Sequence, residues 1–295
     1  MPRVNHGAGV PAAIPAATRM GAVHLEVADL ARSIAYYERG IGLRVQHREH
    51  DRVALGAGGE DLLVLHELPG ARPSRGWCGL YHFALLVPER SDLAVWFAHA
   101  VRQRVPLVGA SDHFVSEALY LSDPDEHGIE IYWDRPRELW EGVVAERMTT
   151  LPLDLQGLLA EQGDEAAFEG ISPGTVVGHV HLRVAELAAT TAFYRDLLGF
   201  ATMATFGGQA AFLSAGGYHH HIGANTWESA GRGQPPPGTA TLKLATVLLP
   251  DLAELQQLVD RIADAGAEPA ALPDGALVRD PSGNQILLAA AGLDR

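Results

Sequence analysis

Val27–Leu43 reads VADLARSIAYYERGIGL, and Val184–Phe200 reads VAELAATTAFYRDLLGF. The two stretches align without a gap at an offset of 157 residues (184 − 27). Each follows a short run in which apolar residues alternate with other residues, AVHLEV at 22–27 and HVHLRV at 179–184. Such alternation is typical of a strand that is buried on one face. The chain therefore contains an internal duplication, and each copy begins with a strand.

The repeated stretch itself has the pattern of a helix. Asp29 stands at the N-cap position, and Leu30, Ile34 and Tyr37 follow at helical spacing. Gly42 ends the helix, because glycine readily adopts the left-handed conformation that closes many helices. We therefore expect the order strand, helix, turn at the start of both halves.

Each half divides again into two modules with the order βαβββ. In the first half, strand-like runs VALGAG and LLVLHEL follow the helix, and a second module contains YHFALLVP, a helix at 91–104, ALYLSD and GIEIYW. The second half repeats the plan with AAFLSA, HHHIGAN, TLKLATVLLP, a helix at 251–266, ALVRD and NQILLA. The expected fold class is α+β, with four βαβββ modules. The expected organisation is a flexible tail (1–19), a first domain of modules one and two (20–136), an acidic, partly helical linker (137–173) and a second domain of modules three and four (174–292).

Composition excludes several classes of protein. The 295 residues suffice for about two domains of roughly 150 residues. With 22 basic and 36 acidic residues the net charge is −14, which repels phosphate backbones, so we expect no nucleic-acid partner. The single cysteine, Cys78, excludes an internal disulfide and a thiolate metal cluster. No apolar stretch approaches the roughly 18 residues of a membrane helix. We expect a cytoplasmic protein that does not bind a membrane.

Repeated βαβββ modules resemble the vicinal-oxygen-chelate, or glyoxalase-like, superfamily. The resemblance covers nearly the whole chain apart from the tail and the linker. It implies that pairs of modules curl into mixed-sheet cups and that such a cup holds a divalent metal ion. The same fold serves isomerases, dioxygenases, thiol transferases and antibiotic-binding proteins, so the site residues must decide between them.

In this superfamily the metal ligands come from the first and last strands of the modules. The last strand of module two carries Glu130, and we take Gln285 as its counterpart in module four. Aligned on their apolar pattern, the four first strands have at their leading position, in order, Ala22, His82, His179 and Leu244.

His82, Glu130 and His179 form a set of two histidines and one carboxylate. Since they belong to modules two and three, we expect these modules to share the functional cup, with modules one and four forming a second cup without metal. His24 and His181 lie two residues further along their strands, and would be ligands if the register slipped by two.

The segment His113–Glu130, HFVSEALYLSDPDEHGIE, carries the sharpest sign of an activity. It resembles the signature of ring-cleaving extradiol dioxygenases, in which a histidine precedes an apolar-Tyr pair, Asp-Pro, a glycine and a glutamate. His113, Tyr120 and Glu130 fall in this order with the right gaps. Glu126 stands where a turn glycine is usual, which concerns the geometry of the loop rather than the chemistry.

Three consecutive histidines lie in the segment SAGGYHHHIG (214–223). In a strand, His219 and His221 would share one face, and His220 would lie on the other. Extradiol enzymes carry an active-site histidine in the corresponding strand, followed by a pattern that His220-His-Ile-Gly fits best, with His219 as the alternative. Altogether the chain resembles the compact bacterial class of catechol 2,3-dioxygenases.

This resemblance implies Fe(II)-dependent extradiol cleavage of catechol, or of a substituted catechol, by O2, with a product of the 2-hydroxymuconate-semialdehyde type. Two histidines and one carboxylate leave three adjacent metal positions open, as in non-haem Fe(II) oxygenases, and Mn(II) would also fit. The implied ligands are His82, Glu130 and His179.

The resemblance also implies roles for three further residues. His220 would stabilise the reduced oxygen and donate a proton, while His113 and Tyr120 would hydrogen-bond the deprotonated catechol oxygen. Histidine suits these tasks because its ordinary pKa is near 6.5.

Two other functions remain open at the level of sequence. A glyoxalase or thiol transferase would share the cup, but usually has two glutamate ligands and a Zn, Ni or Mn ion. A non-catalytic binding protein of the same fold would need no ligands. A homo-oligomer is also open, because exposed strand edges in such cups invite pairing.

Overall fold

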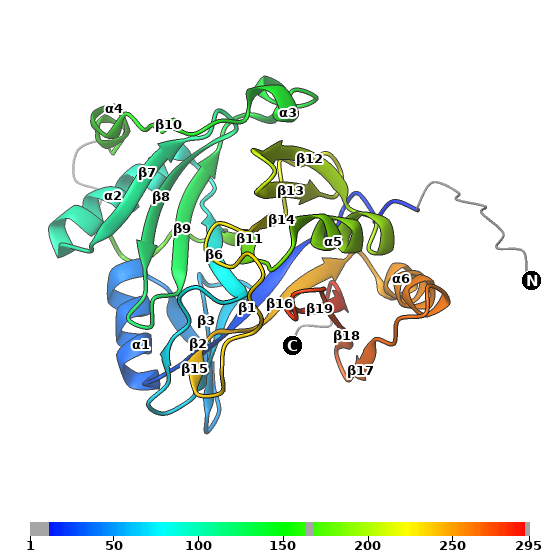
Figure 1. Ribbon diagram of the computed structural model, residues 1–295. Coiled ribbons are helices and arrows are strands. Elements are labelled where there is room, and N and C mark those ends of the chain that lie inside the picture. Colours follow the sequence, from blue (N-terminus) through cyan, green and yellow to red (C-terminus); the bar gives the residue numbers. More distant parts are fainter. Residues whose placement is uncertain (1–11, 163–167, 293–295) are drawn as a thin grey trace, which may run out of the picture.

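The computed structural model describes residues 12–162 and 168–292. Two mixed β-sheets lie side by side, with helices packed against them (Figure 1). Between them the sheets hold most strands of the described residues, and a two-stranded ribbon, β5 (Arg72–Pro73) with β15 (Thr239–Ala240), joins loops of the two halves.

The order of the strands across each sheet shows how the modules combine. The first sheet is β17 (Ala270–Leu272), β18 (Gly275–Arg279), β19 (Gln285–Ala290), β16 (Leu242–Leu249), β1 (Arg19–Val27), β4 (Asp61–Glu67), β3 (Arg52–Gly56) and β2 (Arg44–Arg48). The second is β10 (Leu151–Pro152), β7 (Leu107–Asp112), β8 (Ser116–Ser122), β9 (Gly128–Asp134), β6 (Gly79–Leu86), β11 (Val176–Arg183), β14 (Ile222–Asn225), β13 (Ala210–Ser214) and β12 (Ala201–Phe206).

The sheets combine modules from different halves of the chain. In the first sheet, β1 of module one pairs antiparallel with β16 of module four. In the second, β6 of module two pairs antiparallel with β11 of module three. The expected fold class is therefore confirmed, and so is the expectation that modules two and three share a cup.

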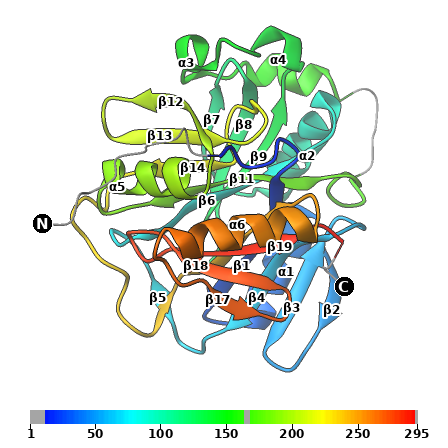
Figure 2. The ribbon, with the colours of Figure 1, turned by 90° about the vertical axis from the view of Figure 1, so that its right-hand side faces the viewer.

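The helices are short, apart from one in module two and one in module four. Figure 2 shows α6 lying across the strands of the first sheet. In the described residues, no helix combines the length and the apolar composition needed to cross a membrane. The helices are α1 (Leu30–Tyr36), α2 (Arg90–Gln103), α3 (Val144–Arg147), α4 (Leu155–Ala160), α5 (Leu187–Ala192) and α6 (Leu252–Asp264), with 3-10 turn η2 (Arg137–Leu139) and π-helical turns η1 (Tyr37–Ile41) and η3 (Phe193–Leu197).

The ends of the first helix follow from its sequence. Asp29 is extended, and its carboxylate accepts a hydrogen bond from the backbone N–H of Arg32 at 2.8 Å, as an N-cap does. Gly42 closes the following π-helical turn with φ = 90°, a left-handed conformation that favours glycine. The predicted helix and both of its ends are thus confirmed, although the last turn is wider than a regular α-helix.

The duplication extends to contacts between modules of the same half. The hydroxyl of Tyr37 donates to Asp123 Oδ2 at 2.9 Å. Its repeat counterpart, Tyr194, donates to Asp280 Oδ2 at 3.4 Å. Each bond ties the helix of one module to the Asp-Pro turn of the next, and this turn precedes the last strand of the half.

Among the strands longer than two residues, four were not predicted from the sequence pattern: β2, β7, β12 and β17. Three of them lie at sheet edges, and β7 is next to an edge. Their residues are largely exposed or only partly buried. A strand with little burial on either face has no apolar alternation to reveal it.

The first part of the expected tail, residues 1–11, lies outside the described residues, but residues 12–18 pack against the second half. Ile14 is buried, and its N–H donates to the carbonyl of Gly199 at 2.9 Å. Arg261 Nη1 donates to the carbonyl of Ala12 at 2.6 Å. The packed chain therefore begins before residue 19, because backbone groups of the second half offer partners to a segment without a strong pattern of its own.

Candidate metal centre and catalytic pocket

Three side chains from the three central strands of the second sheet converge on one face. Glu130 on β9 lies opposite Ala84 on β6, and His179 on β11 lies opposite the same Ala84. His82 shares this face because residues two apart in a strand point to the same side. Ala84 is small, so the space between the three longer side chains stays open.

The distances between these side chains match a shared metal ion. Glu130 Oε2 is 3.0 Å from His82 Nε2 and 3.1 Å from His179 Nε2. Two ligands that each lie about 2.1 Å from one ion, at right angles, are ~3.0 Å apart. One ligand atom from each residue lies within 4.8 Å of the others. The donor set and its spacing therefore fit a divalent cation.

The three residues are buried, and their polar atoms are incompletely satisfied. Glu130 is only 2% exposed. His82 Nε2 and His179 Nδ1 have no hydrogen-bond partner of acceptable geometry among the described residues. Burial opposes ionisation of Glu130, but His179 and His82 hold the pKa of its carboxyl well below the usual range. Burial, against the pull of Glu130, lowers the pKa of His179 to about 4. A neutral imidazole beside a carboxylate is the state that binds a metal.

The expectation that Gln285 matches Glu130 is wrong. β6 and β9 pair Ala84 with Glu130, and in module four the parallel pair β16 and β19 places Leu287 at the equivalent position. Leu287 also follows from the 157-residue offset of the duplication. The positions of the first sheet that correspond to the ligand positions are therefore all apolar: Ala22, Val64, Leu244 and Leu287.

Module three has a glycine at the position that corresponds to Glu130. β11 and β14 pair His181 with Gly223, as β6 and β9 pair Ala84 with Glu130. A Cβ at Gly223 would lie 2.8 Å from Cγ of His181. The imidazole of His181 therefore occupies the space that a ligand side chain at position 223 would need. The cup thus has three candidate ligands.

The two histidines of the alternative register lie outside this set. His181 borders the cavity with its ring centre 5.0 Å from that of His82, and its buried Nε2 has no partner among the described residues. His24 lies in the first sheet, where its Nδ1 is 3.1 Å from His66 Nε2. The ligand atoms that converge are thus those of His82 and His179, as the alignment of the first strands predicted, and not those of His24 and His181.

His113 and Tyr120 form a hydrogen-bonded pair beside the three ligands. His113 Nε2 is 2.7 Å from the Tyr120 hydroxyl, and His113 Nδ1 is 2.7 Å from the carbonyl of Thr149. Because a carbonyl can only accept, His113 Nδ1 carries a proton and donates it to Thr149. The Tyr120 ring centre is 5.6 Å from that of His82. Burial, and then the charge of Glu130, raises the pKa of Tyr120 well above its usual range.

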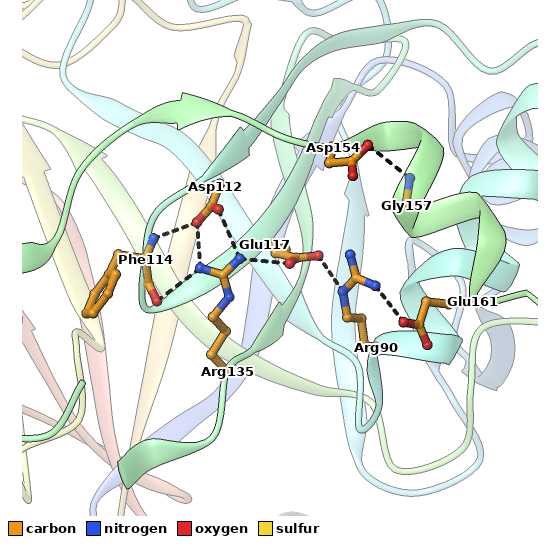
Figure 3. A network of polar contacts seen from close by, with 8 residues as sticks. All are labelled: Arg90, Asp112, Phe114, Glu117, Arg135, Asp154, Gly157 and Glu161. Carbon is orange, nitrogen blue, oxygen red and sulfur yellow. Dashed lines mark hydrogen bonds and ion pairs between the residues drawn. The ribbon is translucent and has the colours of Figure 1, made fainter. Parts of the chain in front are cut away.

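An ion-pair network fixes the hairpin that carries His113. Figure 3 shows Arg135 bound through both terminal nitrogens to Asp112, at 2.8 and 2.9 Å, and through one of them to Glu117 at 2.8 Å. Glu117 also accepts from Arg90 of α2 at 2.8 Å. Asp112 precedes His113, so the network holds the turn between β7 and β8 against the end of β9.

The three consecutive histidines do not lie in a strand, so the expected alternation of faces is wrong. β14 begins only after them, and the two glycines before Tyr218 turn the chain with φ of 58° and 70°. The Nδ1 atoms of His219 and His220 are 2.7 Å apart, whereas His221 Nδ1 accepts from the N–H of Ala215 at 3.2 Å. His220 thus borders the cavity in contact with His219, whereas the His221 ring faces Ala215, just after β13.

His220 lies against the ligand cluster. Its ring centre is 4.0 Å from that of His179. Burial, and then the neighbouring His179, lowers the pKa of His220 well below its usual range. The imidazole is therefore neutral and bears a single proton.

Three polar residues around this site were missed by the sequence analysis: Tyr132, Asp134 and Tyr218. Asp134 Oδ1 is 2.8 Å from His219 Nε2, and Asp134 Oδ2 accepts from Tyr218 at 2.7 Å. The hydroxyl of Tyr132 lies 2.8 Å from the hydroxyl of Tyr218. Tyr132 and Asp134 follow Glu130 at a spacing of two, so period-two alternation along β9 could have found them.

Two of the candidate ligands, His82 and Glu130, and their neighbours border a cavity of about 840 Å³. Its inner wall includes His82, Tyr120, Glu130 and His220. The rest of the wall combines apolar residues with charged ones, among them Phe206, Phe212, Trp227, Val108, Met148, Arg75, Glu126, Arg183 and Glu228. A cavity of this size can hold a small molecule over the ligand cluster.

Comparison with known proteins identifies the family. Residues 19–131 and 176–288 each match the family described as the Glyoxalase/Bleomycin resistance protein/Dioxygenase superfamily. The chain belongs to this superfamily. Each match spans one sequential half, whereas each sheet of this superfamily member takes one module from each half.

Relatives and solved structures agree with the assignment of the chain to this superfamily. The chain is 42% identical over 274 residues to the catechol-2,3-dioxygenase of Bacillus subtilis (strain 168), covering 90% of this chain and 94% of the relative. A candidate dioxygenase of Bacillus subtilis subsp. subtilis strain 168 has a similar structure, with a TM-score of 0.65, 16% identity and coverage of 93% of this chain and 86% of that one. For glyoxalase I of Zea mays the TM-score is 0.57, the identity 17% and the coverages 93% and 92%. The two solved structures support the fold.

Proposed function

We propose that this protein is a catechol 2,3-dioxygenase that cleaves catechol, or a substituted catechol, beside its diol with O2. The observation that carries the proposal is the convergence of His82, Glu130 and His179 next to the His113–Tyr120 pair. The 42% identical relative that is named a catechol-2,3-dioxygenase supports it. When bound, Fe(II) would supply coordination for both diol oxygens and for O2, together with electron transfer between them.

The charge of the ligand set favours the substrate. One carboxylate and two neutral histidines would leave a divalent ion with a net charge of +1. The monoanion of a catechol neutralises this charge, whereas a second carboxylate ligand would remove the attraction. Gly223, at the fourth position, provides no such carboxylate.

The chain's own residues would bind the diol and move its protons. Tyr120 and His113 border the cavity beside the ligands, where the Tyr120 hydroxyl or Nε2 of His113 would donate a proton to a deprotonated diol oxygen, while the bond from Nδ1 to Thr149 holds the His113 ring. His220, on the other side of the ligand cluster, would exchange a proton with the reacting oxygen atoms. Aromatic residues of the wall, such as Phe212 and Trp227, would contact the ring or its substituent, and the cavity has room for one.

The proposal is tested on the full chain, purified without a histidine tag and loaded with Fe(II) without air. On admission of air and catechol we expect a yellow product and one O2 consumed per catechol. Glu130→Gln should abolish both, and Glu60→Gln, which alters an exposed carboxylate paired with Arg19, should not. Iron binding without oxygen uptake across several catechols would reject the proposal and direct the search to glyoxal-type substrates with Zn, Ni or Mn.

Tyr120→Phe provides a second test of the assignment. It removes the hydroxyl that bridges His113 to the pocket and leaves the ring. We expect kcat/KM for catechol to fall by about 100-fold while iron content is unchanged. An unchanged kcat/KM would remove Tyr120 from the proposed machinery.

For location we propose the cytoplasm, in keeping with the single cysteine.

A further inference from the structure

A buried arginine lies on the wall of the cavity, on the same strand as a candidate ligand. His179, His181 and Arg183 alternate along β11, so their side chains share the face of the sheet that forms the cup. Arg183 borders the cavity and is only 7% exposed. At about 3.3 Å per residue, its Cα is about 13 Å from that of His179. A positive charge is therefore fixed in the wall, at a distance from the ligand cluster that a substituted ring can span.

The contacts of Arg183 hold its guanidinium in place without using all of its donors. Nη2 donates to the carbonyl of Leu80 at 2.6 Å, and Nη1 donates to Glu228 Oε2 at 3.0 Å. The third nitrogen, Nε, is buried and has no hydrogen-bond partner among the described residues. The bond to Leu80 fixes the guanidinium to the sheet, and Glu228 is the partner that can change.

A second buried donor lies next to this guanidinium. Asn225 on β14 pairs with Arg183 on β11, and paired residues of a sheet point to the same side. The side-chain oxygen of Asn225 accepts from the N–H of Trp227 at 3.2 Å, whereas its Nδ2 has no partner in the part of the chain that the structure describes. Buried donors without an acceptor are costly, so this corner of the cup favours a ligand that brings acceptor atoms.

Glu228, the present partner of Arg183, can be exchanged for another anion. Its side chain is 53% exposed, against 9% for Arg183. It follows the end of β14, so the sheet does not hold it. When Glu228 leaves, its carboxylate regains water, but the buried guanidinium cannot do so and needs a new anion. A negatively charged ligand group can therefore replace Glu228 at small cost.

Aromatic side chains lie between this arginine and the ligand cluster. The register between β6 and β11 shifts after the pair His82–His181, and the resulting bulge leaves Tyr81 as the extra residue. Since a bulge redirects side chains, Tyr81 and His82 both border the cavity although they are neighbours in sequence. The ring centre of Trp227 is 5.3 Å from that of Tyr81 and 5.6 Å from that of His181. These rings offer a surface for the substrate ring beside the stretch of β11 that leads to Arg183.

We propose that Arg183 is a specificity-determining residue that selects a catechol with an anionic group, a carboxylate on a short arm of the ring. The proposal rests on the proposed dioxygenase function and names its substrate class. The carboxylate would replace Glu228 at Nη1 and accept from the guanidinium. Such a local cation is needed because the net charge of −14 repels an anionic substrate from the surface as a whole. The other ion pair of the wall, Arg75 with Glu126, is more exposed and binds an anion less strongly for that reason.

The first measurement is binding, by titration calorimetry of the Fe(II)-loaded protein under argon. The three probes share one diol: 3-(3,4-dihydroxyphenyl)propanoate, its neutral amide, and 4-(2-aminoethyl)catechol, which carries a cation. We expect the acid to bind about 10- to 100-fold more tightly than the amide, as suits a charge-assisted hydrogen bond to a buried guanidinium, and the amine to bind most weakly. Equal Kd values for the acid and the amide, or tightest binding of the amine, would overturn the proposal.

Two substitutions should move this preference in opposite directions. Arg183→Gln removes the cation and should bring the Kd values of the acid and the amide to within about threefold. Glu228→Gln removes the competing carboxylate and should tighten binding of the acid by about three- to tenfold, with the amide unchanged. Arg195→Gln, an exposed arginine paired with Asp196, is the matched control and should keep the preference. Because Glu228 is exposed, its variant decides the matter even if Arg183→Gln fails to fold: unchanged binding of the acid would contradict the exchange.

Turnover in air separates this inference from the proposed function. The value of kcat/KM should follow the same order, with the acid first and the amine last, and the differences should lie in KM because Arg183 is remote from the reacting atoms. Equal kcat/KM for the acid and the amide would overturn the inference and leave the dioxygenase assignment intact. If neither catechol nor any of the three probes is cleaved, the proposed function fails, while the titrations still decide whether Arg183 selects an anion.

Discussion

Replacing Glu130 by glutamine should remove the response of the protein to metal while leaving the metal-free fold nearly intact. The side chain keeps its shape but loses the charge that lies 3.0 and 3.1 Å from the two ligand nitrogens. The two effects have different magnitudes, and both can be estimated from the geometry of the site.

In the metal-free protein the gains and losses of Glu130→Gln largely cancel. Each hydrogen bond to the buried carboxylate is worth about 1.5–3 kcal/mol, and these bonds weaken in the variant. Against this, burying a charge costs several kcal/mol, and the variant avoids this cost because its amide is neutral. We therefore expect the metal-free melting temperature of the variant to stay within about 5 °C of the unaltered protein.

With metal the two proteins should diverge. A ligand at 100 times its Kd stabilises the folded state by about 2.7 kcal/mol. At about 2–4 °C per kcal/mol, this raises the melting temperature of the unaltered protein by about 5–10 °C. Glu130→Gln, with two ligands left, should show little of this rise.

The assay is thermal unfolding by circular dichroism with and without Mn(II), which is stable in air, and then with Fe(II) under argon. Glu60→Gln serves as the control and should keep the full rise, since this side chain is exposed at the far end of an Arg19 ion pair. An equal rise in Glu130→Gln and the unaltered protein would refute the metal centre built from these three strands.

Three further predictions concern the pocket, acid stability and the first helix. Gly223→Ala places a Cβ 2.8 Å from the His181 ring, so we expect the free energy of unfolding, measured in urea, to fall by about 1–3 kcal/mol. Adding His181→Ala should partly relieve this loss, and additive effects of the two substitutions would contradict the contact. Burial, and then His66, lowers the pKa of His24 to about 3, below its ordinary 6.5, so its contribution to stability is complete above pH 6.5 and is lost as the pH falls toward 3. His24→Thr should therefore reduce the loss of stability between pH 6.5 and 4 by up to about 1.4 kcal/mol per pH unit, and an equal effect of the exposed control His47→Thr would argue against burial as the cause. Asp29→Ala should cost about 1 kcal/mol through loss of the N-cap, measured by the same unfolding; no loss would mean that the hydrogen bond to Arg32 contributes nothing.

Much of the fold could be predicted because its signals are local or repeated. The cap at Asp29, the turn at Gly42 and the apolar alternation of the central strands depend on neighbours in sequence, and the duplication shows each of them twice. The edge strands escaped prediction because burial, not propensity, produces the alternation that reveals a strand.

The types of the candidate ligands were also present in the sequence. Two histidines and a glutamate occur at corresponding positions of modules two and three, and this inventory was enough to predict which modules share a sheet. The counterpart Gln285 was misplaced because the last strands were aligned on their apolar pattern, although the 157-residue offset of the duplication already gives Leu287. Parallel strands meet only in the folded sheet, and a shift of two residues keeps the same face while it changes the partner.

What only the tertiary structure decided is how residues without a shared pattern meet. The sequence of this protein determined a duplicated α+β chain, the capped helices and the residue types of the candidate centre. The folded sheet brought His181 over Gly223, turned the histidine run out of the strand, and placed Asp134 behind His219. These contacts join segments more than 40 residues apart through irregular backbone and strand register, both of which depend on the packing of the whole cup rather than on any local stretch.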